Sequence, residues 1–132
     1  MQIPKELKYT EDHVWVKPQE EEKVIIGVTD FLQDLRGDVL SVSLPEEGTE
    51  VEAGSRLGTI EFSGGVHHLI APISGFVSEV NGDLESSPEY INDDPYGEGW
   101  IVQIQAQDVT DIAALLSEFE YRDQIENYDE ED

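Results

Sequence analysis

The three histidines, two of them adjacent and close to a glutamate, are the residues whose type and spacing best suit metal binding or proton transfer. His67 and His68 are adjacent, Glu61 shortly precedes them, and His13 lies far away in the sequence. Imidazoles bind metal ions and exchange protons near neutral pH. Neighbouring residues of a strand point to opposite faces, so His67 and His68 cannot readily hold one ion even with His13 as a third ligand. We therefore predict no metal site.

No other pattern in the sequence indicates catalysis. The 132 residues include no cysteine, which excludes thiol redox chemistry and thiolate–metal sites. No serine–histidine–acid spacing stands out, and "GSRLG" lacks the lysine and the strand-to-helix context of a phosphate-binding loop. A histidine-dependent metal or small-molecule enzyme stays a low-ranked alternative, and we expect a binding or carrier protein without its own catalytic site.

The two adjacent histidines belong to "IEFSGGVHHLIAP", residues 60–72, which predicts two strands joined by a glycine turn. With Gly64 and Gly65 as the two turn residues, a type I′ or II′ turn would close the hairpin without steric cost. The cross-strand pairs would then be Ser63 with Val66, Phe62 with His67, and Glu61 with His68. Strand alternation places Ile60 and Leu69 on the face that carries Phe62 and His67.

Phe62 at this tip has two interpretations. It either packs against the opposite strand or is an exposed aromatic that anchors a partner. We favour packing, because aromatic residues commonly support hairpins in this way. The candidate partner contacts of the hairpin are Glu61, Phe62, His67 and His68.

The charge of the chain limits its partners. Thirty-one acidic residues against seven Lys and Arg give a net charge of −24. Nucleic acid and anionic membrane would both be repelled. Such charge serves solubility first, and it also steers a protein towards basic surfaces. No stretch approaches the roughly 20 apolar residues of a membrane span, and the start lacks a signal-peptide pattern. We expect a cytoplasmic protein, monomeric on its own.

Short strand-like segments separated by turns dominate the chain. Residues 13–17, 23–29, 38–44 and 100–106 predict strands, with Leu40, Val42 and Leu44 on one face and Trp100, Val102 and Ile104 on another. Thr29 can cap a short helix that Gly37 ends, and Ser87 can cap another before Pro88. From Thr110 onwards, helical spacing of apolar residues predicts a C-terminal helix that includes Ile112, Leu115, Leu116 and Phe119.

These elements predict one mainly β domain over residues 1–120. It would be a small β-sandwich or flattened barrel with short helices and the C-terminal helix laid against it. Residues 121–132 are mostly acidic and are predicted to form a frayed tail.

Several segments then resemble a known family in order and spacing. They are "YTEDHVW", "GVTDFLQDLRGDVLSVSLPEEGTEVEAG", "APISGFVSEVN", "SSPEYIN" and "NDDPYGEGW". The chain resembles the glycine cleavage system H protein, a lipoyl-domain carrier, over nearly its whole length. The resemblance implies the barrel-sandwich hybrid fold of lipoyl and biotinyl domains. In that family "DPYGEGW" reads best as a turn-rich corner that seats Trp100.

The resemblance also implies where a cofactor would be attached. In the family a lysine at the tip of a hairpin, within Glu-Ser-Val-Lys-Ala, carries lipoate through an amide bond. Glu61 and Ala71 keep the family's separation between that glutamate and the alanine of Ala-Pro, which puts Gly64 at the lysine position. The four lysines of this chain all lie within the first 23 residues. Because the amide requires a primary amine, we expect no lipoate on this hairpin and predict no cofactor.

Two functions remain from the resemblance. The first is a non-lipoylated H-like protein that acts by protein binding, as a scaffold, regulator or pseudo-carrier, in glycine cleavage or lipoate-linked metabolism. Its partners would be the decarboxylase, the aminomethyltransferase, the dihydrolipoyl dehydrogenase or lipoylating enzymes. The alternative is the ordinary H-protein role of shuttling an aminomethyl-lipoyl group in glycine decarboxylation, against which the missing lysine argues.

Overall fold

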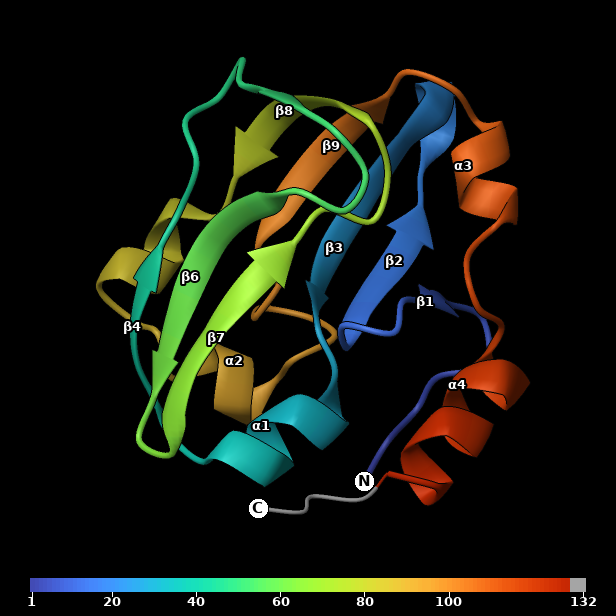
Figure 1. Cartoon of the computed structure of the whole chain (residues 1–132). Helices are drawn as coiled ribbons and strands as arrows, with labels where there is room; N and C mark the ends of the chain where they lie inside the picture. Colours follow the sequence, from blue (N-terminus) through green and yellow to red (C-terminus); the bar gives the residue numbers. More distant parts are fainter. Residues whose placement is uncertain (129–132) are drawn as a thin grey trace.

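The structure is a computed structural model and describes residues 1–128. Two antiparallel sheets face each other, with short helices at one end and one side (Figure 1). The larger sheet has the order β1 (Lys8–Tyr9), β2 (Val14–Pro18), β3 (Lys23–Val28), β9 (Val102–Ala106), β8 (Gly75–Val80) and β5 (Glu50–Val51). The smaller sheet has the order β4 (Val39–Ser43), β6 (Arg56–Phe62) and β7 (Gly65–Ile70). The predicted mainly β fold is thus confirmed as two sheets that do not close into one barrel.

The helical segments are short. They are η1 (Glu20–Glu22), α1 (Asp30–Arg36), η2 (Gly82–Glu85), α2 (Tyr90–Asp93), α3 (Thr110–Ala113) and α4 (Glu118–Glu126). Helices α1 and α2 lie at the end of the molecule where the β6–β7 hairpin turns, and α4 lies beside the N-terminal segment (Figure 1). No helix within residues 1–128 is long and apolar enough to cross a membrane.

Two groups of buried apolar side chains hold the fold together. The main core lies between the sheets, where alternating residues of both contribute, such as Ile26, Ile60 and Ile104, all fully buried. A second, smaller core lies on the other side of β1 and β2, under α4, and consists of Ile3, Leu7, Tyr9, Trp15 and Tyr121.

The first helix forms as the sequence predicts. The Thr29 hydroxyl oxygen accepts a hydrogen bond from the Leu32 backbone N–H, and Gly37 ends the helix with a φ of 92°. Strands β2 and β3 also lie where the sequence places them, within a residue at each end. Local sequence is sufficient here because each signal acts within one turn or one hairpin.

Two smaller predictions are wrong. The ladder between β4 and β6 is irregular between Val39 and Ser41, so Val39 enters the core and Leu40 is 55% exposed. Leu40 therefore does not share a buried face with Val42. The helix after Pro88 begins at Tyr90, so Ser87 is not its N-cap residue.

The C-terminal segment also differs from the prediction of one helix. Leu116 exchanges two backbone hydrogen bonds with Tyr9, which interrupts the helical segment between α3 and α4. Ser117 and Glu120 form a capping box that starts α4, and Phe119 is 76% exposed.

Of the segment predicted as a frayed tail, residues 121–126 complete α4. Tyr121 is fully buried and stacks on Tyr9 with ring centroids 4.8 Å apart. The fold therefore extends beyond residue 120, and residues 129–132 of the predicted tail lie outside the described residues.

Candidate functional site

The candidate site is the tip of the β6–β7 hairpin. Phe62 pairs with Gly65, so the two turn residues are Ser63 and Gly64, one position earlier than predicted. The positive φ of 136° is at Gly65, and neither Ser63 nor Gly64 has a positive φ. The predicted type I′ or II′ turn is therefore wrong, because both need a positive φ at the first turn residue.

This register changes the cross-strand pairs. Glu61 lies opposite Val66, and Thr59 lies opposite His68, so the predicted pair of Glu61 with His68 does not form. The carboxylate of Glu61 instead accepts a hydrogen bond of 3.1 Å from the Ser41 hydroxyl on β4. His68 is exposed, with its Nδ1 3.4 Å from a guanidinium nitrogen of Arg56.

Phe62 does not belong to the surface of the tip. It is 2% exposed and packs in the main core between the sheets, and not against a side chain of the opposite strand, where its paired residue is Gly65. This burial argues against Phe62 as a partner anchor. Ile60 and Leu69 are buried on the same face, as the alternation predicts. Glu61 and His68 are exposed and His67 is half-buried. A partner contact by these three residues stays a prediction.

The hairpin tip is fastened to the end of α1 by backbone hydrogen bonds. The N–H of Ser63 donates to the Asp38 carbonyl (2.7 Å), and the N–H of Asp38 donates to the Ser63 hydroxyl (3.2 Å). The N–H of Gly64 donates to the Arg36 carbonyl (2.8 Å), one of the helix-end acceptors that lack an intrahelical partner. We call these contacts between residues 36–38 and residues 63–64 the tip clamp.

The tip clamp leaves no room for a side chain at Gly64. A Cβ atom built there would lie 2.6 Å from the Arg36 carbonyl oxygen, closer than real Cβ contacts come. Gly37 faces the same restriction from the other side, since a Cβ there would lie 2.5 Å from the Ser63 hydroxyl oxygen. Two glycines thus allow the helix end and the hairpin tip to touch.

A side chain from α2 fixes the helix end of the tip clamp. The Asn92 amide donates to the Gly37 carbonyl (2.9 Å) and to the Gln33 side chain (2.9 Å), and its oxygen accepts from the Val39 N–H (2.8 Å). These three hydrogen bonds reach α1, the connection that follows it and the first residue of β4. Nothing in the sequence marks Asn92 for this role, because its partners are 53 to 59 residues away.

His67 and His13 lie near each other behind the tip, with ring centroids 6.4 Å apart. His67 Nε2 is 3.2 Å from the Asp12 carbonyl, and His13 Nδ1 is 2.8 Å from the Tyr121 hydroxyl. The Tyr121 hydroxyl also contacts the Thr29 hydroxyl at 2.8 Å. His13 thereby joins the start of α1 to α4.

Burial makes both imidazoles poor bases. Loss of solvation lowers the pKa of His13 to about 4, with His67 and Arg36 adding repulsion. Burial also lowers the pKa of His67. Both rings are therefore neutral at pH 7. No group of three or more His, Asp or Glu side chains within residues 1–128 is placed to hold a metal ion. The geometry gives His13 and His67 a structural role.

The residues of the tip do not fit a lipoyl group. Strands β6 and β7 and the turn between them contain no lysine, and the lysines at positions 5, 8, 17 and 23 belong to the first three strands or precede them. The resemblance places Gly64 at the attachment position, and a Cβ atom there would clash with the Arg36 carbonyl oxygen. An amide to lipoate requires an amine that this hairpin lacks.

Comparisons with known proteins decide the family. The model of the Glycine cleavage H-protein family matches residues 7–128. The chain belongs to the glycine cleavage H-protein family. The H protein of Coprothermobacter proteolyticus is 46% identical over 122 residues, covering 92% of this chain and 96% of the relative. That of Bacillus licheniformis is 46% identical over 125 residues, covering 95% and 98%.

A solved structure agrees with this assignment. The crystal structure of a glycine cleavage system H protein from Mycobacterium marinum superposes with a TM-score of 0.84 at 36% identity, covering 93% of this chain and 98% of that chain. H proteins are lipoyl carriers without catalytic activity of their own, which agrees with the expectation of a carrier or binding protein.

Proposed function

We propose that this protein is a non-lipoylated H protein that acts by binding other proteins, in glycine cleavage or lipoate-linked metabolism. The observation that carries the proposal is the hairpin tip, which has no lysine and whose Gly64 is held against the Arg36 carbonyl. A tip held in this way has a structural role, whereas a carrier tip must present an exposed amine to the lipoylating enzyme. The protein would be cytoplasmic and would use no cofactor.

The partners that the family supplies are the decarboxylase, the aminomethyltransferase, the dihydrolipoyl dehydrogenase and the lipoylating enzymes. Identity of 46% over nearly the whole chain supports retention of surfaces that recognise some of them. Without a lipoyl group to carry the aminomethyl group, binding would make the protein a scaffold, a regulator or a competitor of a lipoylated H protein. Glu61, His67 and His68 on β6 and β7 are the candidate contacts next to the tip.

The same full-length identity favours the second candidate, the ordinary role of shuttling an aminomethyl-lipoyl group in glycine decarboxylation. A reconstitution experiment separates the two. This protein is first incubated with a lipoylating enzyme and lipoate. It is then combined with the decarboxylase, the aminomethyltransferase and the dihydrolipoyl dehydrogenase, and glycine cleavage is measured. The non-lipoylated protein gives no activity, and activity that depends on lipoate would establish the carrier role.

Binding is measured separately. Each enzyme is immobilised in turn, and the protein is offered alone and in competition with a lipoylated H protein. The proposal predicts association with at least one enzyme and inhibition of a complete system when the protein is in excess. A lack of association with all of them would overturn a role among these partners.

A further inference from the structure

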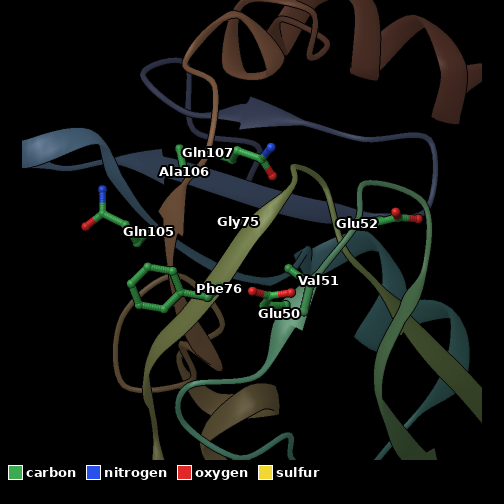
Figure 2. Close-up of a pocket in the computed structure, with 8 residues that line it drawn as sticks. All are labelled: Glu50, Val51, Glu52, Gly75, Phe76, Gln105, Ala106 and Gln107. Atoms are coloured by element: carbon green, nitrogen blue, oxygen red, sulfur yellow. The ribbon is translucent and has the colours of Figure 1, made fainter.

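A second feature of the molecule lies on the larger sheet, away from the hairpin tip. A cavity of about 700 Å³ opens at the sheet edge where β5, β8 and β9 run side by side. Glu50, Phe76 and Gln105 form one cross-strand row along its wall, and Figure 2 shows Phe76 between the other two side chains. The row lies on the outer face of the sheet, because the alternate residues Val77 and Ile104 enter the main core.

The row places an aromatic ring beside hydrogen-bond acceptors. Phe76 is 44% exposed, so its ring is accessible on the outer face of the sheet. The Gln105 amide nitrogen donates to the Glu21 carbonyl at 2.9 Å and lies 3.4 Å from that of Glu22. These contacts hold the Gln105 amide towards η1, and Glu50 is the acceptor beside the ring.

The carboxylates of the cavity have no cation of their own. Glu50 and Glu52 both line the cavity, and the ion pairs within residues 1–128 involve neither of them. Lys23 is the next residue of the row after Gln105, but it is turned to Glu21 at 3.9 Å and does not line the cavity. The lining contains no basic side chain.

The backbone beneath the row is rigidly built. Gly75 lies between Val51 and Ala106 on neighbouring strands, and a Cβ there would lie 1.9 Å from the Gln105 carbonyl oxygen. Strands β8 and β9 can approach closely only because residue 75 is glycine. The strands that carry the row are therefore packed closely against each other.

We infer that this cavity binds an arginine side chain on the surface of a partner protein. A guanidinium can stack on the exposed ring of Phe76 and form paired hydrogen bonds with the Glu50 carboxylate, which lies opposite Phe76 on the neighbouring strand. Two unpaired carboxylates and a net charge of −24 attract a basic surface. The cavity is open to solvent and cannot enclose a small free cation. The surface of a partner protein around its arginine would instead shield the Phe76 ring and the bound guanidinium from solvent.

This inference rests on the binding role proposed above and names the chemistry of one partner contact. The test titrates the full-length ¹⁵N-labelled protein with the blocked peptide acetyl-Gly-Arg-Gly-amide at low ionic strength and follows backbone amide shifts. The matched probe replaces arginine by citrulline, which has nearly the same shape without the charge. The expected shifts concentrate at Glu50, Phe76 and Gln105, and they are absent with citrulline.

Variants distinguish the site from general attraction to an acidic protein. Glu50→Gln is expected to weaken arginine-peptide binding about two- to fivefold, and Phe76→Leu by a similar factor. Glu85→Gln removes an equal charge from an exposed position in η2 that does not line the cavity, and it should change nothing. Equal effects of Glu50→Gln and Glu85→Gln, or equal shifts with citrulline, would overturn the inference. Neither outcome bears on lipoylation, which the reconstitution experiment tests separately.

Discussion

Replacing Gly64 by alanine tests whether the hairpin tip is a structural contact. The new Cβ would lie 2.6 Å from the Arg36 carbonyl oxygen, which is backbone and cannot rotate away. The tip or the end of α1 must move, and the hydrogen bonds from Gly64 and Ser63 to residues 36 and 38 weaken as a result. Overpacking of this kind costs about 1–3 kcal/mol, and each weakened hydrogen bond accounts for about 1 kcal/mol.

Gly82→Ala is the matched control for this substitution. A Cβ at Gly82 has no heavy atom within 4 Å, and like Gly64 this residue has no positive φ. Both substitutions restrict the unfolded chain equally, which favours folding by about 0.4–1 kcal/mol. The difference between the two variants therefore reports the crowding and the weakened hydrogen bonds at the tip clamp, with the unfolded-chain effect removed.

Urea unfolding followed by tryptophan fluorescence measures both variants, because Trp15 is buried in the second core. We expect Gly64→Ala to be less stable than Gly82→Ala by about 1–3 kcal/mol. Gly64→Lys should lose at least as much, since it adds the same Cβ. Equal stability of Gly64→Ala and Gly82→Ala would refute the reasoning, because the tip would then tolerate a side chain.

Three further predictions concern other parts of the fold. Tyr121→Ala should cost about 3–5 kcal/mol in urea unfolding and Phe119→Ala less than about 0.5 kcal/mol, because only the first side chain is buried; equal losses would contradict the placement of α4. Asn81→Ala should cost about 2–3 kcal/mol, since its buried amide donates to two carbonyls before β9; a neutral result would contradict those contacts. The pKa of His13 falls from 6.5 to about 4 on folding, so the unfolded chain binds more protons and stability decreases as pH falls from 6.5 towards 4. Unfolding measured across this range should show a loss of up to about 3 kcal/mol that is reduced in His13→Gln, and an unchanged loss in that variant would disprove the assignment.

Elements whose causes are local could be predicted from the sequence. Thr29 and Gly37 bound α1 because a cap and a left-handed glycine act within one helical turn. The predicted helix from Thr110 failed for a non-local reason, the backbone pairing of Leu116 with Tyr9. The capping box of Ser117 and Glu120 was nevertheless present in the sequence as a signal for a second helix start.

At the candidate site, too, the local feature of the hairpin could be predicted and the feature set by long-range contacts could not. A glycine turn between residues 60 and 72 was predictable, but its register was not. Hydrogen bonds from Ser63 and Gly64 to the end of α1 select the turn, and those partners are about 25 residues away in the sequence. The same shift separates Glu61 from His68. Backbone contacts of this kind leave no trace in residue type except the two glycines that allow them.

The central claim is that this protein carries no lipoate. The most direct test is the intact mass of the protein after co-expression with a lipoylating enzyme in the presence of lipoate, beside an H protein that is known to be lipoylated. The account predicts the unmodified mass for this chain under conditions that fully modify the control. A lipoyl adduct on this chain, mapped to any of its four lysines, would contradict it.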